Sequence, residues 1–141
     1  MTSRTYARTI RQYSAAYGGA GVGVRSYADS DLQSLPTVIA VRAPAGGLTV
    51  GPDPDPADVG MGAPRQQVIT EGDVQCLIIN VEVVPKDKQP DPDRQATSIC
   101  RRSDANFTVD VIGSGQGPEG RQQMIKLTNA AFAAAVNGQT G

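Results

Sequence analysis

Apolar residues recur at short intervals between positions 68 and 84, and this pattern marks the hydrophobic centre of the chain. In the first part of this region, apolar residues occupy both odd-numbered and even-numbered positions. From residue 79 to residue 83, they occupy only the odd-numbered positions. The pattern predicts a strand that is buried first on both faces and then on one. Shorter runs at 37–41, 96–102 and 107–112 predict further strands. We therefore expect a small antiparallel sheet of about four strands.

A second pattern, with apolar residues spaced three and four apart, predicts an amphipathic helix over residues 119–136. Pro118 suits the first turn of a helix, and Asn137 with Gly138 supplies a stop signal. The apolar face consists of Met124, Ile125, Leu127, Thr128, Ala131, Phe132, Ala135 and Val136. A sheet followed by such a helix predicts an α+β fold in which the C-terminal helix packs on the sheet.

The N-terminal region differs from the rest of the chain in charge and in aromatic content. Residues 1–28 contain four arginines and no acidic residue, whereas residues 29–141 contain 9 basic and 14 acidic residues. A helix is predicted over residues 3–17, followed by a glycine-rich hinge at 18–23. One helical face would carry Tyr6, Ile10, Tyr13 and Tyr17, and another Arg4, Arg8 and Arg11. We therefore divide the chain into a Tyr/Arg arm (1–28) and a single small domain (29–141).

Three interpretations of this arm compete. It packs on its own domain with the arginines in water, or it docks on a neighbouring subunit, where Tyr and Arg are favoured contact residues. The third interpretation is contact with nucleic acid, which four arginines support only weakly. We therefore expect protein partners, either further copies of this chain or other structural subunits, rather than nucleic acid.

The segments between the predicted elements are rich in Pro and Gly. Residues 51–65 contain four of the ten prolines, and residues 85–95 form a second long polar stretch. Such composition predicts long irregular loops, which we expect to make secondary contacts with partners.

Composition excludes several classes of chemistry. The chain has no His, so it holds neither a Ser-His nor a Cys-His nucleophile pair and no imidazole-ligated metal. Two cysteines are too few for a zinc site, and no apolar run approaches the roughly 18 residues of a membrane span. Asp110 is the one acid placed firmly on a predicted strand, and it has no evident partner. We expect no enzyme activity, no metal, no cofactor and no membrane insertion.

Residues 115–122 match the glycine spacing of a phosphate-binding loop. However, Arg121 stands where lysine is required, and Gln122 replaces the Ser or Thr that would hold magnesium. The expected sheet also lacks parallel strands with crossover helices. We interpret this segment as a plain turn between the last strand and the helix.

Cys76 and Cys100 lie on neighbouring predicted strands. If the turn between these strands is centred near residue 90, Cys76 sits opposite residue 104, one diagonal step from Cys100. This arrangement allows a disulfide, although free Cys is a common core residue and two buried thiols are the favoured alternative.

A modest core, a Tyr/Arg arm and long loops without catalytic residues are typical of an assembly subunit. The first hypothesis is a structural protein of a tailed-phage virion, assembled in the host cytoplasm. It would be a capsid decoration or cement subunit, or a ring protein of the head-tail connector or tail. The alternative is a binding module of a secreted or envelope protein, located outside the cell, with a Cys76–Cys100 disulfide.

Overall fold

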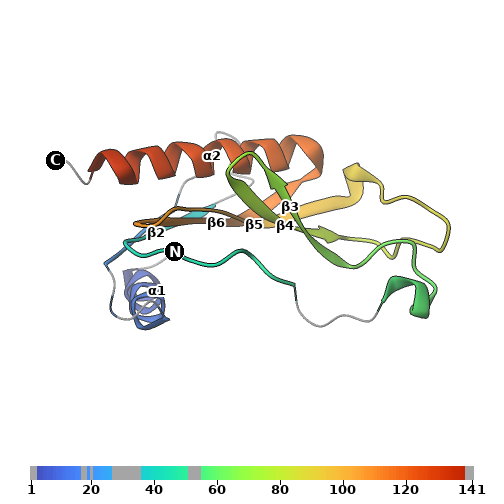
Figure 1. The fold of residues 1–141 in the computed structure, drawn as a ribbon, viewed down its shortest axis with the longest axis horizontal. Helices are drawn as coiled ribbons and strands as arrows, with labels where there is room; N and C mark the ends of the chain where they lie inside the picture. The colour runs from blue at the N-terminus through green and yellow to red at the C-terminus, as the bar shows by residue number, and fades with distance from the viewer. Residues whose placement is uncertain (1–2, 17–18, 20, 27–35, 51–54, 139–141) are drawn as a thin grey trace.

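The computed structural model describes residues 3–16, 19, 21–26, 36–50 and 55–138. One antiparallel sheet of six strands lies between a long C-terminal helix on one face and a shorter N-terminal helix near the other (Figure 1). The strands are β1 (Val22–Ser26), β2 (Thr37–Val41), β3 (Gln66–Glu71), β4 (Val74–Asn80), β5 (Gln95–Ser103) and β6 (Thr108–Gln116). The helices are α1 (Ser3–Ala16) and α2 (Gly117–Gly138), with short 3-10 turns η1 (Pro56–Val59) and η2 (Pro92–Arg94). The α+β class is confirmed.

The sheet has the order β1-β2-β6-β5-β4-β3, so it contains six strands rather than about four. The region predicted as one segment over 68–84 is a hairpin of β3 and β4, turned at Gly72, whose φ of 59° lies where glycine is favoured. The other unexpected strand is β1, which includes part of the predicted glycine-rich hinge and pairs along its length with β2. Neither strand was separable from its surroundings by local pattern.

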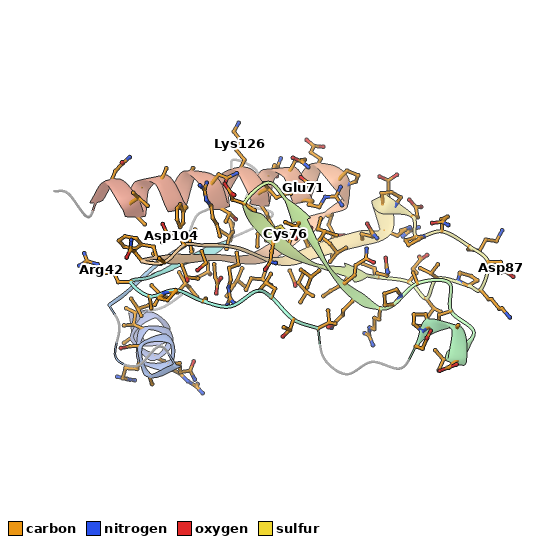
Figure 2. The ribbon with its side chains drawn as sticks, viewed as in Figure 1. Arg42, Glu71, Cys76, Asp87, Asp104 and Lys126 are labelled. Carbon is orange, nitrogen blue, oxygen red and sulfur yellow. A yellow bond between two sulfur atoms is a disulfide. The ribbon has the colours of Figure 1, made fainter. Side chains whose placement is uncertain are left out.

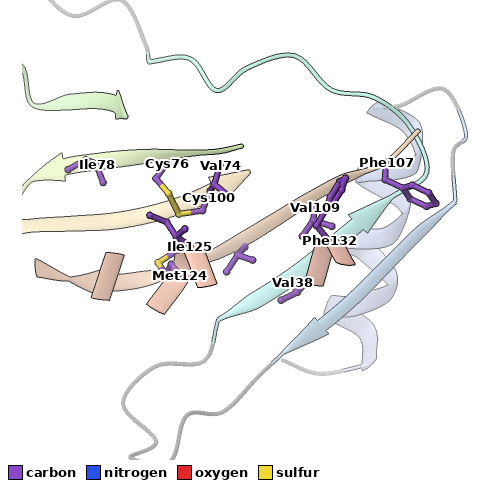
Figure 3. Close-up of a cluster of buried hydrophobic side chains, with 11 residues drawn as sticks. Val38, Val74, Cys76, Ile78, Cys100, Phe107, Val109, Met124, Ile125 and Phe132 are labelled. Atoms are coloured by element: carbon purple, nitrogen blue, oxygen red, sulfur yellow. A yellow bond between two sulfur atoms is a disulfide. The ribbon is translucent and has the colours of Figure 1, made fainter. Parts of the chain in front are cut away.

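The main core lies between α2 and the facing side of the sheet (Figure 3). Phe107, Val109 and Val111 belong to it. Met124, Ile125, Thr128 and Phe132 are buried on α2, so most of the predicted apolar face is the packing face, whereas Val136 at its C-terminal end is exposed. The remaining members of the cluster are Val38, Val74, Cys76, Ile78 and Cys100. Burial of these side chains is the main stabilisation that orients α2 across the strands.

The opposite face of the sheet is crossed by an extended segment, residues 43–48, which we call the strap. The strap does not pair with any of the described strands. Instead, polar side chains of β4, β5 and β6 form hydrogen bonds with its backbone. Thr108 Oγ1 donates to the Ala43 carbonyl (2.8 Å), and Ser103 Oγ accepts from the Ala45 N–H (3.0 Å). Further along, Arg101 Nη1 donates to the Gly46 carbonyl (3.1 Å), and Gln75 Oε1 accepts from the Leu48 N–H (2.9 Å). The backbone groups of the strap thereby give hydrogen-bond partners to the polar side chains on this face of the sheet.

The turn between β5 and β6 is organised by one carboxylate. Asp104 Oδ1 accepts hydrogen bonds from the backbone N–H groups of Asn106 (2.7 Å) and Phe107 (2.8 Å), and these bonds lower the pKa of Asp104. Because that pKa is lower in the folded than in the unfolded chain, the contribution to stability is present above the ordinary pKa of Asp. It is lost as the pH falls through the lowered value.

Close contact of two glycines fixes where α2 leaves the sheet. A Cβ atom added to Gly120 would lie 2.6 Å from the backbone carbon of Gly115, and one added to Gly115 would meet the Gly120 carbonyl at the same distance. Alanine normally stabilises a helix relative to glycine by up to about 1 kcal/mol. Here we expect Gly120→Ala to destabilise the protein by about 2 kcal/mol, because backbone atoms must shift to relieve the overlap.

Urea unfolding measures this effect. Gly138→Ala is the matched control, since a Cβ there meets nothing within 4 Å. Equal unfolding free energies for the two variants would show that the glycine contact does not determine the position of the helix.

Candidate binding groove

An apolar groove of about 640 Å³ runs between the C-terminal half of α2 and the β1 side of the sheet. Four small residues of the helix form one wall, and β1 with β2 forms the other. The lining residues are Gly21, Val22, Gly23, Val38, Ala40, Val41, Arg42, Phe107, Ala131, Ala134, Ala135 and Gly138. Arg42, exposed at the same end of the molecule as the C-terminus of α2 (Figure 2), is the one charged residue among them. Its volume lies within the range that ligand clefts span.

The groove exists because its helix wall carries only Ala and Gly and because Gly21 and Gly23 on the opposite wall carry no side chain. The helix packs mainly against β5 and β6, and toward β2 and β1 it presents residues 131, 134, 135 and 138, which are all Ala or Gly. On the opposite wall, a Cβ at Gly23 would meet no atom within 4 Å. The sheet therefore extends one strand further than the helix covers, and the space above that strand stays open.

Half of the predicted arm forms α1, but the predicted interface residues do not line the groove. The helix packs against β1 and lies on the other side of the sheet from α2 (Figure 1). Arg8 and Arg11 are exposed on it, and Ile10 is half-buried. The backbone of α1 also carries Arg4, Tyr6 and Tyr13, whose side chains are outside the described part, and Tyr17 lies outside the described residues altogether. The interface assigned to the arm therefore stays a prediction.

The two cysteines face each other directly across β4 and β5. Their Cα atoms are 4.1 Å apart, and a disulfide joins Cys76 to Cys100. The predicted diagonal register is wrong. Asn80 pairs with Gln95, so the connection between the strands is centred before residue 90, and Ser98, an extra residue in β5, shifts the pairing by one position. Both residues are buried in the main core beside α2 (Figure 3). The structure thus has a bonded pair where two free thiols were the favoured expectation.

Asp110 has a partner that the sequence did not reveal. Its carboxylate accepts two hydrogen bonds from the guanidinium of Arg101, Nε to Oδ1 at 2.7 Å and Nη2 to Oδ2 at 2.9 Å. The side chain of Asp110 is 1 % exposed and that of Arg101 is 17 % exposed. A carboxylate held in a bidentate ion pair is engaged structurally, so it offers no free base to a substrate.

The glycine-rich segment before α2 does not form a phosphate-binding loop. Strand β6 continues through Gln116, and α2 begins at the next residue, so no loop separates the two elements. Arg121 faces Glu71 of β3, with Nε 3.8 Å from Oε1, and Gln122 Nε2 donates to the other carboxylate oxygen of Glu71 at 2.9 Å. Both side chains therefore connect the helix to the β3–β4 hairpin.

Other kinds of site find no support in the part of the chain that the structure describes. It brings together no group of three or more metal-ligating side chains. None of the helices described there is both long and apolar enough to cross a bilayer.

No protein-family model matches the chain, and no curated protein or solved structure is significantly similar to it. The groove, the disulfide and the chemistry of the residues around them are therefore the features that bear on function.

Proposed function

We propose that this chain is a non-enzymatic binding module of a secreted or envelope protein that works outside the cell. The observation that carries the proposal is the Cys76–Cys100 disulfide, which lies in the main core and joins two central strands. Disulfides form and persist in oxidising compartments and are rare in the cytosol. A bonded pair at this position supports export.

The groove supports binding rather than catalysis. Its lining contains no acid, thiol or hydroxyl side chain, so it offers neither a nucleophile nor a general base. Asp110, the buried carboxylate of the sheet, forms an ion pair with Arg101 and lies on the sheet face that is turned away from the groove. Apolar walls with a single cation at one end suit the docking of an apolar partner.

A virion subunit is the second candidate, and the observation that favours it is α1. Arg8 and Arg11 are exposed on this helix, away from the face that α2 covers. An arm of this kind can dock on a neighbouring subunit, as the first hypothesis requires. The virion-subunit hypothesis predicts a homo-oligomer or a larger assembly, whereas the binding-module hypothesis predicts a monomer.

Thiol counting tests the Cys76–Cys100 disulfide, on which the proposed export rests. The full chain is produced in the cytosol and, separately, with export to an oxidising compartment, and thiols are alkylated after denaturation with and without reductant. We expect the exported protein to react with the alkylating agent only after reduction, with a mass that shows an intramolecular bond. Two alkylated cysteines in the unreduced exported protein would overturn the proposal.

Light scattering after gel filtration separates the two candidates. The arm is removed by deleting residues 1–20, because deletion of 1–28 would also remove strand β1. A monomer at all concentrations, with or without the arm, is expected for the binding module. A closed oligomer that dissociates when residues 1–20 are deleted would favour the assembly subunit instead.

A further inference from the structure

We propose that β1 and the groove together bind an extended, apolar peptide segment of another protein, which adds to the sheet as a seventh strand beside β1. This inference rests on the proposed binding function and specifies its partner. Two features of the structure carry it, the unpaired edge of β1 and the apolar space directly beside that edge.

Strand β1 is the first strand of the sheet, and no described strand pairs with its outer side. The Arg42 N–H donates to the Gly21 carbonyl at 2.9 Å, which makes these residues a hydrogen-bonded pair of the β1–β2 ladder. In an antiparallel ladder such pairs alternate, so Gly23 and Arg25 also direct their backbone groups toward β2. The N–H and C=O groups of Val22, Val24 and Ser26 consequently point outward, where an added strand would find them.

The groove provides the matching sites for side chains. In the β1–β2 register, Gly23 pairs with Ala40 and therefore faces the α2 side of the sheet, where it carries no side chain. A strand paired with β1 would place every second side chain on this side, between Gly23 and the alanines of α2. Because these walls are apolar, the inserted side chains would be apolar as well, whereas the alternate residues can be polar.

This combination selects an extended chain over other occupants. An acyl chain or an amphipathic helix would fill the groove but leave the outward backbone groups of β1 unpaired. A second copy that paired through its own β1 would satisfy those groups, yet it would present Gly21, Gly23 and Arg25 to the groove and leave it unfilled. An extended peptide with alternating apolar side chains satisfies both requirements.

The test uses a displayed library of random eight-residue peptides, selected on the full-length oxidised protein. Selected peptides are then synthesised, and their affinities are measured by fluorescence anisotropy against the parent and four variants. Gly23→Val fills the groove from the strand side, where a Cβ meets nothing within 4 Å. Val24→Pro removes an outward N–H that the β1–β2 ladder does not use, which an edge strand tolerates.

Two matched controls leave the site intact. Val24→Ala keeps the backbone N–H, and Ala133→Leu enlarges an exposed α2 residue that does not line the groove. Thermal unfolding verifies that every variant is folded. If Val24→Pro is unfolded, the binding measured with Gly23→Val alone decides the test.

We expect the selected peptides to alternate apolar and other residues. Their binding should weaken at least tenfold in Gly23→Val and Val24→Pro and stay within about twofold in both controls. In the parent, bound peptide should slow hydrogen exchange at the amides of Val22, Val24 and Ser26. Failure to select any peptide, or equal binding to parent and blocked variants, would overturn this inference.

The outcomes for the two proposals are separable. A disulfide-bonded monomer that selects no peptide would refute the added strand and leave the extracellular binding module standing. Free thiols in the exported protein would refute the proposed function whatever the peptide result.

Discussion

Replacing Arg101 by methionine is expected to lower the free energy of unfolding by about 4 kcal/mol. The substitution leaves the carboxylate of Asp110, 1 % exposed, without the guanidinium that now donates two hydrogen bonds to it. It also removes the hydrogen bond from Arg101 to the Gly46 carbonyl, which attaches the strap to the sheet. Urea unfolding at neutral pH, followed by far-UV circular dichroism, gives the difference.

Two controls show whether burial is the cause. The pair formed by Arg94 and Glu82 lies at the surface, with both side chains more than 60 % exposed, so Arg94→Met is expected to cost less than about 1 kcal/mol. The double variant Arg101→Met with Asp110→Leu replaces both charges by apolar groups and should recover most of the loss. Equal costs for Arg101→Met and Arg94→Met would contradict a special contribution from the buried pair.

Reduction of the disulfide is expected to lower stability by about 3.5 kcal/mol, because Cys76 and Cys100 close a loop with a sequence separation of 24. Opening that loop gives the unfolded chain more conformations and shifts the unfolding equilibrium toward it. For a chain of this length, the midpoint of thermal unfolding should fall by about 10 °C. Urea and thermal unfolding with and without dithiothreitol measure the change.

The double variant Cys76→Ala with Cys100→Ala is the control for this experiment. It lacks the bond, so reductant should leave its unfolding curve unchanged, and its stability should lie close to or below that of the reduced parent. An unfolding curve of the parent that does not respond to reductant would show that the disulfide does not contribute to folding.

These two effects concern opposite faces of the same central strands. The disulfide joins β4 to β5 under α2, and the Arg101–Asp110 pair joins β5 to β6 under the strap. The edge strand β1 takes part in neither. We therefore expect the centre of the sheet to be rigid while β1, the strand proposed to accept a partner, is held mainly by pairing with β2.

Several elements were predictable because their signals are local. Strand β2 matches the predicted run at 37–41, and α2 extends the predicted helix by two residues at each end. In each case the spacing of apolar residues along a short stretch determines which face is buried, so the pattern alone identifies the element. The helix of the arm follows the same logic and ends at Ala16, within one residue of the prediction.

Local pattern failed where pairing with a distant segment decides the structure. Gly23 disfavours a strand by its own propensity, yet β1 forms because β2 supplies a complete ladder for it. The extra residue at Ser98, which sets Cys76 opposite Cys100, leaves no signal in the spacing of apolar residues. The same holds for Arg101 and Asp110, nine residues apart in sequence, which meet because β5 and β6 pair in this register.

The sequence by itself determined the α+β class, the terminal helices, the packing face of the C-terminal helix and the exclusion of histidine-based chemistry. Only the tertiary structure decided the number of strands, the bonding of the cysteines, the engagement of Asp110 and the groove beside β1. The physical reason is that periodicity and composition report which side of an element is buried. Strand partners, register and the space left between elements instead depend on contacts between residues far apart in the chain.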